Sequence, residues 1–117
     1  TDTSPLDVTD GIFFLKSDGA TTVTFVVEKD STQSTLDLPN ALADDTFMTV
    51  GFVYDPKDQK FHVFQNNVLA GTVVNTNAPD DEELALSFGI QNGAAAAKTL
   101  TVDYIGAQKE RTAVTEL

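Results

Sequence analysis

The chain contains no cysteine and no tryptophan, and it has only one histidine and one methionine. The absence of cysteine excludes disulfides, thiolate metal sites and a cysteine nucleophile, and it leaves the redox compartment unassigned. No apolar run approaches the roughly 18 residues that a membrane-spanning helix requires. The first residues also lack the basic and then apolar order of a signal segment.

Basic residues are scarce as well, with 7 Lys and Arg against 18 Asp and Glu, which gives a net charge of −11. Such a surface repels phosphate backbones and anionic lipids, so we expect neither nucleic acid nor a membrane as a partner. Acidity of this kind keeps a β-rich protein soluble. A second interpretation is a role beside a basic partner or cations.

Apolar residues make up 41% of the 117 positions, enough for one domain with a hydrophobic core. Eight Phe and many Val and Thr residues favour pleated strands over helices, and four consecutive alanines are too few to nucleate a helix. Apolar alternation and turn residues predict about eight strands. Their ranges are 11–16, 22–28, 34–38, 48–54, 61–65, 68–74, 84–91 and 98–106.

Short strands joined by hairpin turns predict an all-β fold, an antiparallel β-sandwich over residues 1–106. Residues 107–117 are polar and form a tail or a docking arm. The chain begins at Thr1 in turn-forming residues, and we expect these residues to belong to a longer polypeptide. In that case the sandwich is the C-terminal part of a larger domain.

The clearest pattern is a double hairpin over residues 47–74. Met48, Val50, Phe52 and Tyr54 alternate with other residues and should line one face of a strand. A two-residue type I′ turn at Asn66-Asn67 would place Phe64 opposite Leu69, Val63 opposite Ala70 and His62 opposite Gly71. Both faces of this meander carry apolar side chains. One face should form the core, and the other needs a cover of its own.

The sequence contains no motif that is typical of a catalytic site. A serine triad would have to use His62, which lies mid-strand, and no Gly-x-Ser-x-Gly elbow is present. Carboxylate pairs occur only where loops are predicted, and there Asp normally turns the backbone. These pairs are Asp7 with Asp10, Asp44 with Asp45, Asp55 with Asp58, and the run 80–83. We therefore expect a protein that is not an enzyme and that has no cofactor.

Calcium and glycans are the two ligands that the residues leave open. Asp80, Asp81 and Glu82 form the densest local group of oxygen ligands, although no Asp-x-Asp-x-Asp-Gly loop surrounds them. Tyr54, Phe64 and Tyr104 are the candidate aromatic platforms for a sugar. Aromatic residues at alternating strand positions more often belong to a core.

Residues 47–55 (FMTVGFVYD) and 60–72 (KFHVFQNNVLAGT) resemble the laminin-G-like and concanavalin A-like jelly rolls. In those families an aromatic strand ending in Tyr-Asp precedes a hairpin with an Asn-Gly or Asp-Gly turn, for which this chain has Asn66-Asn67. The resemblance implies a jelly-roll sandwich. The calcium and sugar ligands of the lectins have no matching positions here, and the tryptophan platform is missing.

A wider set of segments is similar to a group of virion or lectin-like proteins of marine tailed bacteriophages. The segments are residues 10–16, 51–55, 79–82, 87–93 and 98–105. This resemblance implies a structural protein located in the virion, such as a capsid decoration or head-fibre component. Its partners would be capsid proteins or neighbouring copies in an oligomeric assembly. The alternative is a lectin-like module that binds host or particle-surface glycans.

Overall fold

The structure is a computed structural model that describes residues 8–81, 84–85 and 99–108. These residues form two three-stranded antiparallel sheets. The first sheet contains β1 (Gly11–Leu15), β2 (Thr24–Lys29) and β3 (Thr32–Asp37). The second contains β4 (Val50–Asp55), β5 (Lys60–Gln65) and β6 (Val68–Val74), and a 3-10 helix, η1 (Asn75–Asn77), follows β6. The prediction of an all-β antiparallel fold is confirmed.

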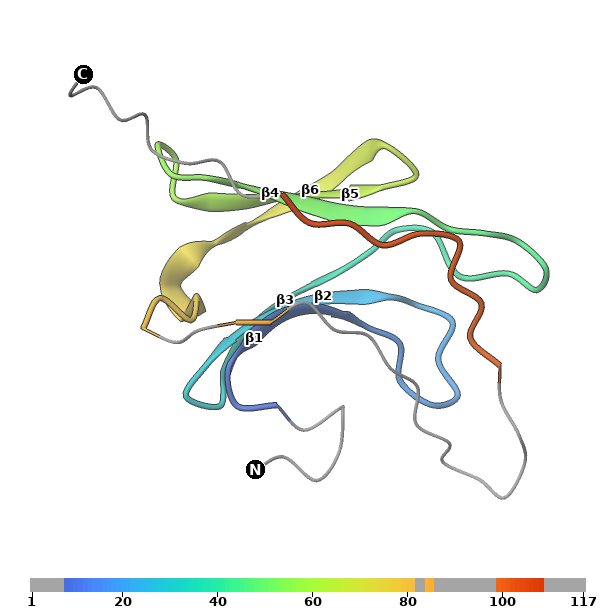
Figure 1. The fold of residues 1–117 in the computed structure, drawn as a ribbon, viewed down its shortest axis with the longest axis horizontal. Helices are drawn as coiled ribbons and strands as arrows, with labels where there is room; N and C mark the ends of the chain where they lie inside the picture. Colours follow the sequence, from blue (N-terminus) through green and yellow to red (C-terminus); the bar gives the residue numbers. More distant parts are fainter. Residues whose placement is uncertain (1–7, 82–83, 86–98, 109–117) are drawn as a thin grey trace.

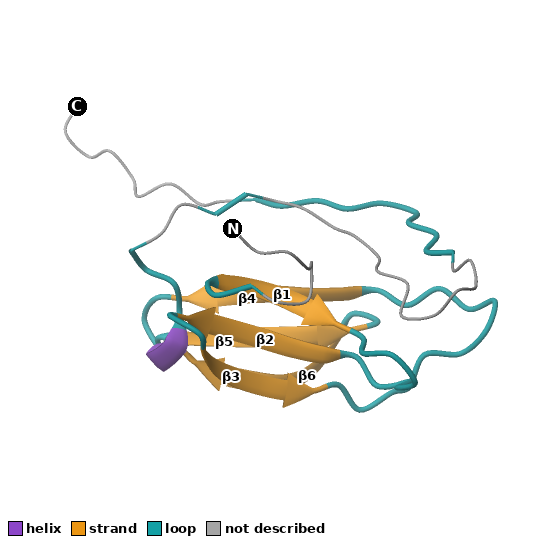
Figure 2. Ribbon diagram, turned by 90° about the horizontal axis from the view of Figure 1, so that it is seen from below, coloured by secondary structure: helices purple, strands orange, loops and turns teal. Residues whose placement is uncertain are grey.

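The two sheets pack face to face as the layers of a small sandwich (Figures 1 and 2). The Phe14 ring of β1 lies 6.4 Å from that of Phe52 on β4, measured between ring centroids. Phe25 of β2 lies 5.9 Å from Phe61 of β5 in the same way. The core between the sheets consists of buried apolar side chains. They are Val23, Phe25, Val27, Leu38, Phe61, Val63 and Val73.

Two hairpins use two-residue turns in which both central residues have positive φ. Asn66 and Asn67 have φ of 52° and 65°, as the predicted type I′ turn requires. Asp30 and Ser31, with φ of 49° and 63°, join β2 to β3 in the same way. β1 and β2 also form a hairpin, with a longer loop that extends from Lys16 to Val23 and contains Asp18-Gly19.

The predicted register of the β5–β6 hairpin is right next to the turn and wrong beyond it. Phe64 lies opposite Leu69 as expected, but Val63 lies opposite Gly71 and His62 opposite Thr72. The register shifts between Val63 and Phe64, where Ala70 is an extra residue of β6. The extra residue lets Leu69 point to the outer face beside Phe64, while Val73, opposite Phe61, still points into the core.

Other expectations for single segments need correction. We predicted a strand over residues 98–106, with Leu100, Val102 and Tyr104 pointing inward. Residues 99–106 instead form no strand, and these three side chains are exposed. Leu84 and Ala85, the start of another predicted strand, lie in a loop, and residues 86–91 lie outside the described residues. Periodicity alone overestimated residues 99–106, because alternation of apolar side chains does not by itself specify backbone pairing with another strand.

The sandwich is closed on one side and open on the other. On the closed side β3 faces β6, and the two Cδ atoms of Leu36 fill the space above Gly71, where a Cβ would lie only 3.0 and 3.2 Å from them. η1 bridges the layers there through a hydrogen bond from Asn77 Nδ2 to Ser34 Oγ. On the open side, β1 and β4 are the edge strands of their sheets. In the described part of the chain, no helix has the length and apolar character to span a bilayer.

Candidate functional site

The open side of the sandwich borders a groove of about 1410 Å³. One wall is formed by β4 and by Ile12 and Phe14 of β1, and the other by residues 100–108. Phe52, one of the alternating residues that were expected to line one face of a strand, lies on the inner face of β4 at this edge and is 41% exposed. The centroid of its ring lies 5.4 Å from that of Phe25, so Phe52 packs on the core at the edge of the sandwich. The core of the sandwich therefore continues into the groove.

The outer face of the second sheet carries an apolar cluster, which consists of Val53, Phe64 and Leu69. Phe61, Val63 and Gln65 are buried, so the alternate residues of β5, His62 and Phe64, point away from the core. Phe64 pairs with Leu69 on one side and with Gly51 on the other, and Val53 is its diagonal neighbour. Val53 is 59% and Leu69 54% exposed. The meander thus has apolar side chains on both faces, as its sequence predicted.

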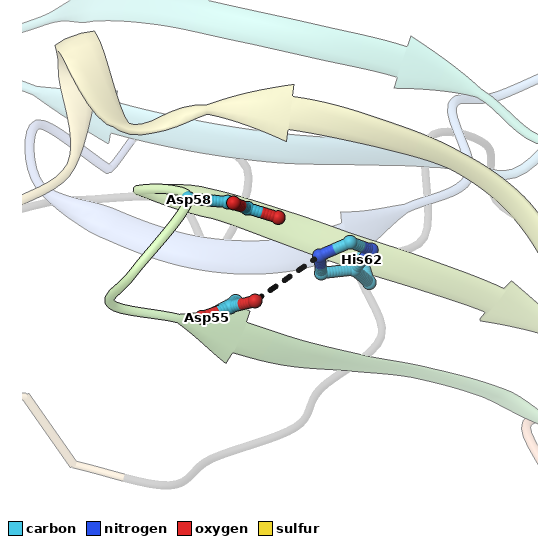
Figure 3. Close-up of side chains that lie close together, drawn as sticks. All are labelled: Asp55, Asp58 and His62. Carbon is cyan, nitrogen blue, oxygen red and sulfur yellow. Dashed lines mark ion pairs between the residues drawn. The ribbon is translucent and has the colours of Figure 1, made fainter.

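At one end of the same outer face, Asp55, Asp58 and His62 come together (Figure 3). Asp55 ends β4, Asp58 lies in the following turn and His62 is on β5. One ligand atom from each lies within 4.8 Å of the others, and His62 Nε2 is 4.0 Å from Asp55 Oδ2. The backbone N–H of Lys57 donates to Asp55 Oδ1, which leaves Oδ2 directed toward the imidazole. Carboxylate and imidazole together suit a divalent transition metal better than calcium.

The acids predicted as calcium ligands have a different partner. Lys29 Nζ donates to Asp80 Oδ1 at 2.6 Å and lies 3.8 Å from Asp81 Oδ1, while Glu82 is outside the described residues. The hydrogen bond from Lys29 lowers the pKa of Asp80 below its usual 3.8, and the same bond raises the pKa of Lys29 above 10.5. Asp80 and Asp81 thus form an exposed ion pair with an ammonium group.

The three aromatic candidates for a sugar platform do not lie on one surface. Tyr54 faces inward, with its ring 4.8 Å from that of Phe61 and its hydroxyl accepting from Asn75 Nδ2. Phe64 points to the opposite face of the same sheet. Tyr104 lies across the groove from β4 and is largely exposed. Only Tyr54 and Tyr104 line a common groove.

The Asp55–Asp58–His62 cluster was not predicted as a unit. The sequence offered a signal, because Asp55 and Asp58 flank a turn and His62 follows in the returning strand. The decisive information is the pairing of Asp55 with Lys60 and of Val53 with His62. That register makes Asp55 and His62 diagonal neighbours on one face.

Comparisons of this chain with protein-family models, with curated proteins and with solved structures find no match. The surfaces described above are therefore the basis for any functional argument.

Proposed function

We propose that this chain is a non-enzymatic structural protein of a tailed-phage particle, a capsid decoration or head-fibre component. It binds capsid proteins or neighbouring copies through the outer face of its second sheet. The observation that carries the proposal is the apolar cluster of Val53, Phe64 and Leu69 on a strand face that the domain's own core does not use. The phage assignment itself comes from the sequence resemblance.

The surroundings of the cluster have the composition of an interface. On the same face, the neighbouring cross-strand rows carry the polar residues Asp55, Lys60, His62 and Thr72, together with the exposed Val74 at the far end. Protein interfaces commonly combine an apolar centre with a polar rim. An apolar strand face left in water also favours aggregation, so a partner that covers it removes that cost.

Co-sedimentation with capsids of the encoding phage, assembled without this protein, tests the proposal. The wild-type chain should bind at a fixed stoichiometry. Leu69→Asp should weaken binding at least tenfold, which corresponds to about 1.4 kcal/mol, because a carboxylate would be buried in the contact. Thr35→Asp is the matched control, since Thr35 is an exposed strand residue on the outer face of the first sheet. Its binding should equal that of the wild type.

A wild-type chain that does not sediment with capsids, or a Leu69→Asp variant that binds normally, contradicts the proposal. The carbohydrate-binding alternative rests on Tyr54 and Tyr104, which line one groove. A saturable signal on a glycan array that Tyr104→Ala abolishes would favour that alternative and overturn the structural role.

A further inference from the structure

The second sheet ends at β4 with an edge that no strand of the described residues pairs with. β4 is six residues long and contains neither lysine nor proline, two residues that commonly protect sheet edges. Each unpaired N–H and C=O along it is a strong hydrogen-bonding group. The inner side chains of this strand, Phe52 and Tyr54, also remain partly exposed at the edge. Both the backbone and the core thus need a further element here.

A segment of the same chain lies beside this edge. Residues 99–108 run along the β4 side of the sandwich (Figures 1 and 2). Residues 100–108 form the far wall of the groove. Within this segment Leu100, Val102 and Tyr104 alternate with Thr101 and Asp103, which is the pattern of a strand with one buried face. Val102 is 41% and Tyr104 71% exposed. Leu100, Val102 and Tyr104 are thus exposed, although their alternation is that of a strand with one buried face.

We propose that residues 100–105 dock onto the edge of β4 in the same molecule as an additional strand. Leu100, Val102 and Tyr104 then pack against Phe52 and Tyr54 and fill the groove, while Thr101 and Asp103 face outward beside Val53. The segment is matched to this site by its alternation, by its position along the groove and by its length, which equals that of β4. The outer face of the sheet then remains the surface for a partner.

The chain has no cysteine, so engineered pairs test this docking directly. Val53→Cys points outward from β4 and is combined in turn with Thr101→Cys, Asp103→Cys and Ile105→Cys in the full chain. Same-face neighbours on adjacent strands have Cβ atoms close enough for a disulfide. At least one pair should form an intramolecular disulfide under mild oxidation, seen as a monomer on a non-reducing gel. Leu69→Cys with the same three partners is the control and should stay reduced, because β5 separates β6 from β4.

Three cross-linking results overturn the proposal. The first is the absence of a disulfide in all three Val53→Cys pairs. Equal cross-linking from Val53→Cys and Leu69→Cys would mean that the segment samples the whole face. Disulfide-linked dimers in place of monomers would assign the β4 edge to a second copy of the chain. Cross-linking of the isolated protein is independent of capsid binding, so its failure is distinguishable from failure of the proposed function.

A second measurement tests whether residues 100–105 alternate between buried and exposed positions. Val102→Ser should lower the urea concentration at the midpoint of unfolding, because it removes an apolar group from the filled groove. Thr101→Ser, the adjacent outward position, should leave the midpoint unchanged. Equal midpoints for both variants and the wild type would show that residues 100–105 do not pack on the sandwich.

Discussion

At the scale of single residues, the buried polar side chains differ in how they are satisfied. Gln65 is 2% exposed, and its amide accepts from the N–H of Asn40 and donates to the Asn40 carbonyl and to the Met48 sulfur. It thereby ties the strand β5 to the chain segment that leads into β4. Glu28 is also buried, but its Oε2 has no hydrogen-bond partner among the described residues.

Gln65→Leu should lower the free energy of unfolding by about 1–2 kcal/mol, because it keeps the side-chain volume and removes the hydrogen bonds to Asn40. Urea denaturation followed by circular dichroism measures this loss. Gln33→Leu makes the same chemical change at an exposed position of β3 and should be near neutral. Equal effects of the two substitutions on the free energy of unfolding would show that the hydrogen bonds between Gln65 and Asn40 do not stabilise the fold.

At the scale of elements, the two type I′ turns impose the same geometry on different residues. Asn67 tolerates positive φ, whereas Ser31, at φ 63°, pays a steric cost that glycine would not. Both turns leave their flanking strands in register directly at the loop, at Lys29 with Thr32 and at Gln65 with Val68.

Ser31→Gly should therefore stabilise the protein, by about 0.5–1 kcal/mol, since relief of the left-handed conformation outweighs the added entropy of the unfolded chain. Thermal unfolding should show a higher midpoint for this variant. Ser17→Gly serves as the control, because Ser17 is not in the left-handed region and gains no such relief. A lower midpoint for Ser31→Gly would show that the turn is not strained.

At the scale of the whole molecule, the two sheets approach most closely where β3 meets β6. Gly71 makes this approach possible, since any Cβ there would press on the Leu36 side chain, whereas Gly51 on β4 has open space around the same position. The two glycines lie in adjacent cross-strand rows, on either side of β5. A Cβ at residue 71 would point between the sheets toward Leu36, whereas a Cβ at residue 51 would point to the outer face of the second sheet.

Gly71→Ala should be less stable than Gly51→Ala, because its Cβ would lie 3.0 and 3.2 Å from the Cδ atoms of Leu36 and that side chain would have to shift. Gly51→Ala should be neutral or slightly stabilising, because alanine suits a strand at least as well as glycine. Denaturant titration of both variants gives the comparison. If the two alanine variants have the same stability, the close contact of β3 with β6 is absent in solution.

The double hairpin and its turn at Asn66-Asn67 were predictable from the sequence, because period-two alternation and turn residues are local properties. The same holds for the absence of cysteine chemistry and for the apolar residues on both faces of the meander. The bulge at Ala70 was not predictable, since it arises from the need to bring Val73 into a core supplied by the other sheet. The missing strand at residues 99–106 was likewise not predictable, because backbone pairing depends on the tertiary arrangement and alternation does not specify it.

The sequence by itself determined the class of this protein and its acidic surface, because composition and alternation act over a few residues. The register of the β4–β5 hairpin brings Asp55, Asp58 and His62 together. Only the tertiary structure decided which apolar face is buried and which side of the sandwich is open. Those features depend on strand register and on the packing of one sheet against the other. They join residues that are separated along the chain, so no local pattern specifies them.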